Sequence, residues 1–285
     1  MIALVAEATQ RIRVGSGAVL LPHYAPLKVV ETFSVLHALF PDRIDLGLGR
    51  APGGSGLDAY ALQRQRDAAE KDDFAQQLLE LLAFFNQSFP EQHPFSKIAV
   101  SPNTPGLPEI WLLGSSGWSA DAAAQLGLPY AAAHFINPET TRKSVEHYLR
   151  HFKPSQYLSE PQALVAPGAI CAETEEEAQR LYASQRLRRV LRDLGDRGPI
   201  PTPEVALERL AGNTAQALGD GEWPRIFVGS VEQVHEGLDK MGRELGIDEL
   251  MLITVVHDHE AGKHSYELLA GAFDLTPETA APSIL

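Results

Sequence analysis

The stretch RIRVGSGAVLLPHYAPLKVVETFSVLHALFPDRIDLGLGRAPGG, residues 11–54, decides the fold. Residues 12–21 are rich in β-branched and apolar side chains and predict a buried strand. Residues 25–40 follow with a proline near the expected helix start and apolar side chains at helical spacing. Residues 43–50 then predict a second strand. Strand, helix and strand in this order indicate a parallel sheet covered by helices.

The alternation of strand and helix continues to the end of the chain. Four more strands are predicted at residues 109–116, 130–136, 163–173 and 248–256, and helices at residues 72–85, 119–127, 139–152, 174–189, 230–246 and 265–273. Two architectures have this order, the doubly wound sheet and the TIM (β/α)8 barrel. We favour the barrel, because no GxGxxG fingerprint follows the first strand.

The barrel is expected to lack its N-terminal part. A complete barrel needs eight strands, whereas six are recognisable in this sequence. Residues 1–10 have the pattern of the last turns of a helix, so the chain is expected to be N-terminally truncated. Two Pro-containing stretches near residues 89–108 and 193–223 are predicted insertions in a single domain of residues 1–285.

Composition narrows the classes of protein and of partner. The 285 residues are 44% hydrophobic and 21% charged, which allows a sizeable core. Asp and Glu total 37 against 24 Lys and Arg, and the net charge of −13 disfavours nucleic acid and anionic membranes as partners. No apolar stretch approaches the roughly 20 residues that span a bilayer, and a cytoplasmic protein is expected. Cys171 is the only cysteine, which excludes an intrachain disulfide and a cysteine-based zinc site.

Candidate site residues follow the predicted strands, because a barrel carries its active site at the carboxyl ends of its strands. Gly15 and Gly17 leave bare backbone within residues 12–21, either for a flat ligand or for a tight corner of the barrel. His23 is interpreted as a hydrogen-bonded structural residue in preference to a base. Arg50, beside glycines, is interpreted as binding an anion in preference to pairing with a carboxylate.

A second anion site is predicted in the stretch GSSGWSADAAAQLG, residues 114–127. A helix is expected to begin near Ser119, and a helix N-terminus with unpaired N–H groups binds phosphate readily. Ser115, Ser116, Gly117 and Ser119 supply hydroxyls and bare backbone there. Capping of the helix by Ser119 is the simpler interpretation, and the two can hold together. We favour the phosphate, because the serines and glycines exceed what a cap needs.

Other chemistries have less support. Asn137, His257, Asp258 and His259 also follow predicted strands, but an HxH pair in a loop, with no further His, Asp or Glu cluster of matching spacing, is weak evidence for a metal site. We therefore expect no metal. Neither a GxSxG elbow nor a cysteine near a plausible base is present, which disfavours nucleophilic hydrolysis.

Residues 11–54, 112–138 and 248–260 resemble the luciferase-like monooxygenases, the flavin-dependent family that includes bacterial luciferase, and most of all its small single-component branch. The likeness extends over residues 2–273. It implies a (β/α)8 barrel with FMN, or F420 in some branches, at the strand ends. By resemblance, Gly17 and Ala18 match a non-prolyl cis peptide bond that supports the flavin ring. Arg50 and the segment of Ser115, Ser116, Gly117 and Ser119 match the flavin phosphate site.

The resemblance also implies an activity and partners. We expect an oxidoreductase that uses reduced FMN and O2 on a small organic substrate, with a flavin reductase as a possible partner and a homodimer for the full-length protein. An F420- or flavin-dependent reductase without O2 chemistry, and a non-catalytic flavin-binding or truncated remnant, are the alternatives. Family members carry an acidic-histidine motif in an N-terminal strand–helix–strand segment that precedes the equivalent of Met1, so the catalytic residue is unassigned and His23 is a weak candidate.

Overall fold

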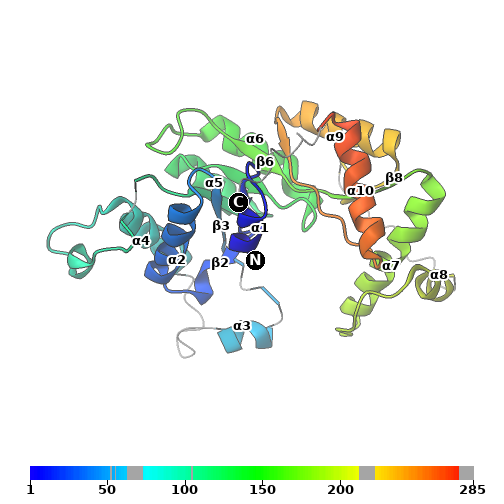
Figure 1. Cartoon of the computed structure of the whole chain (residues 1–285), viewed down its shortest axis with the longest axis horizontal. Helices are drawn as coiled ribbons and strands as arrows, with labels where there is room; N and C mark the ends of the chain where they lie inside the picture. Colours follow the sequence, from blue (N-terminus) through cyan, green and yellow to red (C-terminus); the bar gives the residue numbers. More distant parts are fainter. Residues whose placement is uncertain (52, 55, 63–72, 104, 212–221, 276–285) are drawn as a thin grey trace, which may run out of the picture. The chain divides into compact units, whose positions relative to one another are not determined.

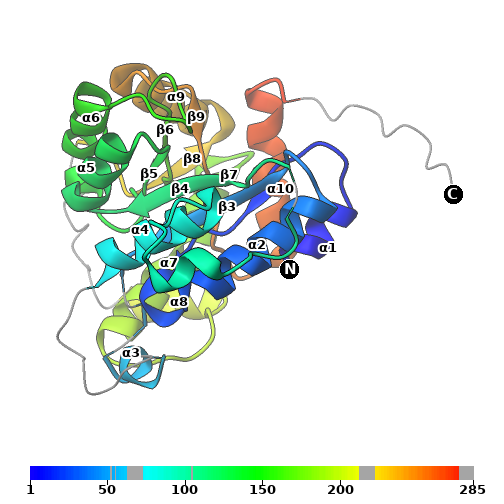
Figure 2. The ribbon, with the colours of Figure 1, turned by 90° about the vertical axis from the view of Figure 1, so that its left-hand side faces the viewer.

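The computed structural model describes residues 1–275 except residues 52, 55, 63–72, 104 and 212–221. Contacts divide the chain into two compact units, residues 1–131 with 147–163, and residues 132–146 with 164–285. Figures 1 and 2 show the elements of both units from two directions. The single domain predicted for residues 1–285 stays a prediction.

The first unit is built on β3 (Ile44–Gly49), which has parallel neighbours on both sides. β1 (Val14–Gly15) and β2 (Val19–Leu20) pair with it on one side and β4 (Glu109–Gly114) on the other. The helices of this unit are α1 (Ile2–Glu7), α2 (Pro26–Leu39), α3 (Gly56–Leu62), α4 (Phe74–Asn86) and α5 (Gly117–Leu126), with 3-10 turns η1 (Leu21–His23) and η3 (Pro94–Lys97). α2 and α4 lie side by side, and α2 packs on β3 (Figure 2).

The second unit contains two parallel strand pairs. β6 (Ala163–Val165) pairs with β9 (Glu249–Leu250), and β7 (Gly168–Ala172) pairs with β8 (Ile226–Ser230). Its helices are α7 (Glu175–Asp193), α8 (Pro203–Leu210), α9 (Val231–Leu245) and α10 (His259–Ala272), with the 3-10 turn η4 (Pro138–Thr140). The boundary between the units falls within β5 (Tyr130–Ala132), α6 (Thr141–His151) and β6. α7 and α8 lie side by side (Figure 1).

The predicted parallel α/β fold is confirmed, with corrections to individual elements. Each of the six predicted strand regions contains a strand, but residues 12–21 and 163–173 each contain two short ones. Pro167 interrupts the latter because it has no N–H group to donate to a neighbouring strand. In the former, the Ser16 hydroxyl donates a 2.9 Å hydrogen bond to the Gly47 carbonyl between β1 and β2. α3, α8 and β8 were not predicted, because α3 lies in the glycine-rich stretch after Arg50, α8 lies in the predicted insertion at residues 193–223, and β8 begins just after it.

Arg43 fixes the N-terminal helix to the start of β3. One of its amino groups donates to the carbonyl oxygens of Ala6 at 3.0 Å and of Thr9 at 2.8 Å. The other donates to the Thr9 hydroxyl at 2.7 Å, and Nε donates to the Ile12 carbonyl at 3.0 Å. A helix leaves its last carbonyl groups without partners inside the helix, and a cation near that end is favourable. Arg43 therefore joins α1 and the segment after it to the sheet.

Replacing Arg43 with alanine is expected to lower the free energy of unfolding by about 2–3 kcal/mol, the scale of losing charged hydrogen bonds at a half-buried site. Urea denaturation followed by circular dichroism measures it. Arg43→Lys, which keeps the charge but not the planar set of donors, should recover only part of the loss. A loss below about 0.5 kcal/mol, typical of an ordinary surface position, would show that these bonds do not hold α1 in place.

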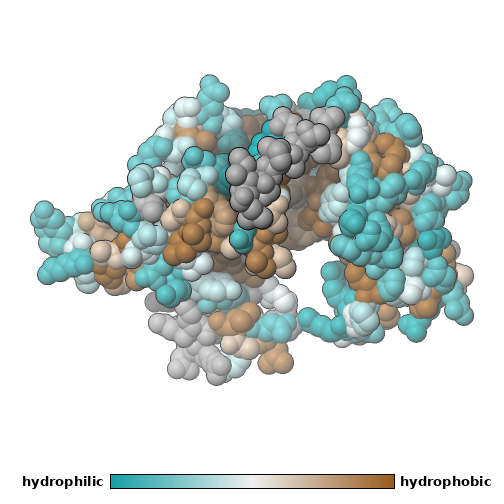
Figure 3. Space-filling view, viewed as in Figure 1, coloured by the Kyte–Doolittle hydropathy of each residue, from teal (hydrophilic) through white to brown (hydrophobic). Residues whose placement is uncertain are grey.

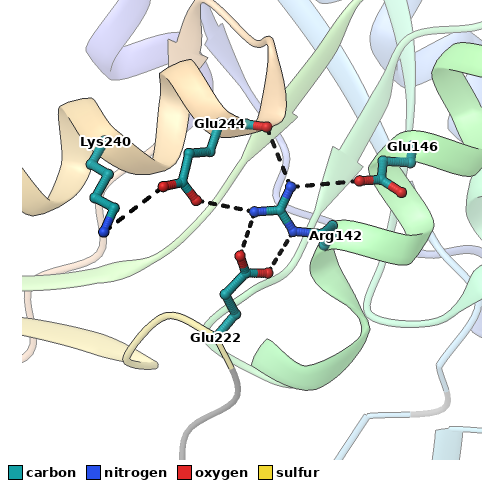
Figure 4. A network of polar contacts seen from close by, with 5 residues as sticks. All are labelled: Arg142, Glu146, Glu222, Lys240 and Glu244. Atoms are coloured by element: carbon teal, nitrogen blue, oxygen red, sulfur yellow. Dashed lines mark hydrogen bonds and ion pairs between the residues drawn. The ribbon is translucent and has the colours of Figure 1, made fainter.

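In the second unit, Arg142 at the start of α6 forms ion pairs with three carboxylates (Figure 4). It lies 2.5 Å from Glu222, 3.0 Å from Glu244 and 3.5 Å from Glu146. The hydrogen bonds with Glu222 are the largest cause that holds the pKa of Arg142 above its usual range, and Arg142 in turn lowers the pKa of Glu222. Lys240 approaches Glu244 at 3.8 Å, so both cations of the network come from helices.

Some large apolar side chains of the first unit are exposed. Figure 3 shows hydrophobic residues among hydrophilic ones on the visible face, including the place that α3 occupies in Figure 1. On α3, Leu57, Tyr60 and Leu62 are each at least half exposed. This apolar helix begins six residues after Arg50 in the chain.

Within the described residues, no helix is both long and apolar enough to cross a membrane.

Candidate functional site

The candidate site lies in the first unit, where β2, β3 and β4 end at the same edge of the sheet. Leu20 of β2 pairs with Gly49 of β3, and Gly49 pairs with Leu113 of β4. Arg50 follows Gly49 directly after the end of β3, and Gly114 follows Leu113 as the last residue of β4. Because the strands are parallel, these residues meet at one edge, as predicted for the carboxyl ends of barrel strands.

The two glycines of the first predicted strand have different surroundings. A Cβ atom at Gly15 would lie 2.6 Å from the Asp45 carbonyl oxygen and 2.7 Å from the Asp45 Cβ atom, so packing against β3 requires glycine there. At Gly17, the nearest contact among the described residues would be the Leu113 side chain at 4.0 Å. The sequence left two interpretations open for these glycines, a face for a flat ligand and a tight corner of the barrel. The tight corner applies to Gly15. Gly17 has the bare, open backbone face that a flat ligand needs.

Gly47 of β3 lies behind this bare segment. A Cβ atom at Gly47 would lie 2.0 Å from the Ser16 carbonyl oxygen and 3.0 Å from the Leu113 side chain. The peptide bond between Gly17 and Ala18 is cis, as the resemblance implied. Ser16 is also held by its backbone N–H, which donates to the Asp45 carbonyl at 3.1 Å. The backbone of residues 16–18 is therefore in close contact with β3 on one side and open at Gly17 on the other.

The serine-rich stretch forms the N-terminus of α5, with a correction to the predicted start. The helix begins at Gly117 and Ser116 is its N-cap, so Ser119 is not the cap. Gly117 begins the helix despite its low propensity, because the first turn tolerates residues that the interior does not. Ser119 is buried, and its hydroxyl oxygen lies 2.3 Å from where a Gly114 Cβ atom would be. Its side chain therefore packs against the end of β4.

The remaining residues of the stretch are placed to offer hydrogen-bond donors. Ser115 is half-buried, and Ser116 and Gly117 are exposed. The Ser116 side chain makes no capping hydrogen bond to the part of the chain that the structure describes. The first N–H groups of a helix have no acceptor within the helix, and they carry the positive end of its dipole. This end of α5 can therefore bind an anion with its backbone and with the hydroxyls of Ser115 and Ser116.

Arg50 approaches the same helix end through an aromatic residue that was not singled out in the sequence. Its guanidinium carbon lies 4.9 Å from the centroid of the Trp118 ring, which is a cation–π contact. Trp118 meets the ring of Phe74 edge-on, at 5.3 Å between centroids and 76° between planes. The signal for Trp118 was one large aromatic residue within a run of serines, glycines and alanines. Phe74 carried no such local signal.

His23 closes the turn η1, three residues beyond the end of β2, and is half-buried. It therefore follows a strand that ends at the same edge as Arg50. Its assignment as a base stays a prediction, and so does its assignment as a structural residue.

The other residues considered from the sequence lie in the second unit. Asp258 is the N-cap of α10 and accepts a 2.8 Å hydrogen bond from the Ala261 N–H group. His257 contacts the Ile200 carbonyl oxygen at 2.9 Å, and His259 is the first residue of α10. Asn137 is the N-cap of η4. No group of three His, Cys, Asp or Glu side chains that could hold a metal ion occurs among the described residues.

Cys171 is a packing residue. It is buried in β7, where its backbone N–H donates a 2.9 Å hydrogen bond to the Ser265 hydroxyl. Burial, with a smaller effect of nearby glutamates, raises the pKa of its thiol to about 11. The thiolate is the nucleophilic form of cysteine, so Cys171 stays protonated and unreactive at neutral pH.

Comparison with known proteins identifies the family. The family model described as luciferase-like monooxygenase matches residues 1–249. The solved structure of apo-MsnO8 shares 44% sequence identity and has a TM-score of 0.89, with 97% of this chain and 81% of that chain covered. A protein of Escherichia coli strain K12 named luciferase-like monooxygenase is 36% identical over 271 residues, which are 94% of this chain and 78% of the relative.

A more distant solved structure shares the fold alone. It is the oxygenating constituent of 3,6-diketocamphane monooxygenase from Pseudomonas putida, a type II Baeyer–Villiger monooxygenase in complex with FMN. It has 21% identity and a TM-score of 0.63, with 99% of this chain and 83% of that chain covered. The predicted family and its fold type are thus confirmed: the chain belongs to the luciferase-like monooxygenases.

Proposed function

We propose that this chain is a flavin-dependent monooxygenase that binds FMN at the common edge of β2, β3 and β4 and uses its reduced form with O2 on a small organic substrate. The observation that carries the proposal is the pairing of a bare, open backbone face at Gly17 with an anion-binding helix end at Ser116 and Gly117. FMN combines the two matching features, a flat ring system and a phosphate group. The diketocamphane enzyme, which shares the fold, is itself described in complex with FMN.

The residues of the site fit such a cofactor by their chemistry. Gly17 and Ala18 would support the flat ring, since no side chain of Gly17 stands between it and the backbone. Arg50, the hydroxyls of Ser115 and Ser116 and the first N–H groups of α5 would bind the phosphate. When bound, reduced FMN supplies the electrons that activate O2. The protein's own part is to bind and orient the cofactor and to exclude water around it.

Several parts of the proposal go beyond the family. His23 remains a candidate catalytic base. Ser119 is the weakest of the phosphate candidates, because its hydroxyl is buried against Gly114. A flavin reductase as electron donor, a homodimeric assembly and a cytoplasmic location complete the proposed function.

Arg50→Ala tests the phosphate site. Because the variant removes a charged donor, its affinity for FMN should fall roughly 10- to 100-fold, which corresponds to about 1.4–2.7 kcal/mol. Its affinity for riboflavin, which has no phosphate, should stay within about twofold. Titration of each flavin, followed by quenching of its fluorescence, gives both constants.

Arg13→Ala is the matched control for this experiment. Arg13 pairs with Asp45 and with Glu109 at 2.6 Å, at the opposite ends of β3 and β4 from Arg50. This variant should bind FMN as the unchanged protein does. Equal losses in Arg50→Ala and Arg13→Ala, or equal losses for FMN and riboflavin, would count against a phosphate site at Arg50.

The use of O2 is tested separately. Reduced FMN with a candidate substrate should give substrate-dependent O2 uptake beyond the spontaneous oxidation of the free cofactor. Hydride transfer from reduced F420 or reduced flavin to the substrate without O2 would instead support the reductase alternative. Tight flavin binding without turnover of any substrate tried would support the non-catalytic one.

A further inference from the structure

We infer that Trp118 is a positioning residue that holds Arg50 for the flavin phosphate and so sets the preference of the site for a phosphorylated flavin; this inference rests on the proposed function. The observation behind it is a series of three side chains from three elements of the first unit. Phe74 begins α4, Trp118 is the second residue of α5, and Arg50 follows β3. The ring of Trp118 contacts both of the others.

The position of Arg50 explains why a contact that restricts its side chain matters for binding. Arg50 is exposed, and it follows the last residue of β3 outside any helix or strand. A long arginine side chain in this position has many rotamers, and ordering it on binding opposes affinity. A cation–π contact restricts those rotamers before the ligand arrives, and tryptophan has the most favourable ring for it. A guanidinium can contact an aromatic ring with its face and bind a phosphate with the N–H groups in its plane, so the two contacts are compatible.

Trp118 is itself in contact with a buried aromatic residue. Phe74 is 1% exposed, and its ring meets the Trp118 ring edge-on, a favoured geometry for two aromatic rings. Trp118 also belongs to the first turn of α5, so its backbone N–H is one of the donors at the helix end. One residue thus fixes the distance between the two proposed phosphate-binding groups, the Arg50 guanidinium and the N-terminus of α5.

A purely structural role for Trp118 makes a different prediction. Trp118 is half-buried, so its ring could simply fill space over Phe74. In that case leucine, which is apolar and bulky, would replace it with little effect on any ligand. A positioning role requires an aromatic face, so phenylalanine should replace tryptophan where leucine does not. It also requires that the effect be confined to ligands that carry a phosphate.

Trp118→Leu and Trp118→Phe are therefore compared in the full chain, with FMN and riboflavin as probes and a thermal melt for each variant. We expect Trp118→Leu to weaken FMN binding roughly 5- to 10-fold, within the range of a partly desolvated cation–π contact, and to leave riboflavin binding unchanged. Trp118→Phe should keep most of the affinity for FMN. Adding Trp118→Leu to Arg50→Ala should cause no further loss, because the two residues act through one contact.

The outcomes separate this inference from the function beneath it. If the unchanged protein prefers FMN over riboflavin and Arg50→Ala removes that preference, the phosphate site stands. Three results would then overturn the role of Trp118 alone. They are an unaltered preference of Trp118→Leu for FMN over riboflavin, equal losses of FMN affinity in Trp118→Leu and Trp118→Phe, and additive losses of FMN affinity in the double variant. If the unchanged protein binds FMN and riboflavin equally well, the phosphate site and the role of Trp118 both fail.

Discussion

Replacing Gly47 with alanine is expected to lower the free energy of unfolding of this chain by about 3 kcal/mol or more. The added methyl group would lie 2.0 Å from the Ser16 carbonyl oxygen, well inside van der Waals contact. Ser16 is bound to β3 by two hydrogen bonds of its own. Its N–H donates to the Asp45 carbonyl, and its hydroxyl donates to the Gly47 carbonyl. The strain therefore has no flexible side chain to relieve it, and β3 or the segment before β2 must move.

The loss would be a large share of the stability of an ordinary domain, which is about 5–15 kcal/mol. Urea denaturation of Gly47→Ala beside Gly17→Ala measures it. Gly17 is the matched control, since its added Cβ atom would meet only the Leu113 side chain, at 4.0 Å, among the residues described. We expect Gly17→Ala to change the free energy of unfolding by less than about 0.5 kcal/mol. Equal stability of the two variants would mean that Ser16 and Gly47 are not in close contact.

The second large effect is expected on ligand binding. Gly17→Val should lower the affinity for FMN by at least roughly 100-fold, because a branched side chain on the open backbone face occupies the place proposed for the flat ring. A thermal melt should show that the variant remains folded, since the Cβ atom at Gly17 would meet only the Leu113 side chain, at 4.0 Å, among the described residues. The affinity for riboflavin should fall by a similar factor, since riboflavin and FMN have the same ring system. Calorimetric titration with both flavins gives the result.

A control glycine excludes a general effect of added side-chain volume. Gly271 lies near the end of α10, and a Cβ atom there would have no heavy atom within 4 Å in the described part of the chain. Gly271→Val should therefore bind FMN normally. If Gly17→Val binds FMN as tightly as Gly271→Val does, the ring does not lie against Gly17, and the proposed site must be moved.

The parts of the fold that the sequence predicts are those set by local periodicity. Residues 11–54 have a clear strand, helix and strand pattern, and β2, α2 and β3 appear within them. α3 and β8 follow stretches rich in glycine or proline that predict loops, and packing against the rest of the fold decides them. The start of α5 was displaced by two residues, because Ser116 and Ser119 are equally good caps by residue type.

The sequence predicts which residues belong to the candidate site, but it does not predict which side chains surround them. Gly15 and Gly17 are indistinguishable in the sequence, and Asp45 on the neighbouring strand makes one of them a packing requirement. Arg50 was found from its place after a strand. Phe74, which supports it through Trp118, begins a different helix, and only the tertiary fold brings the two rings together.

The Arg142 network makes the effect of a substitution depend on what has changed before it. Loss of Glu222 alone leaves Arg142 with Glu244 and Glu146 as partners, whereas loss of Arg142 leaves three carboxylates close together. In that second background, removing Glu222 or Glu146 relieves repulsion and becomes favourable, whereas Glu244 still has Lys240 as a partner. Each step is small because these charges are partly exposed, but its sign is set by the order. Mutational paths through this part of the chain are thus directional: a glutamate partner of Arg142 is lost more easily after the arginine than before it.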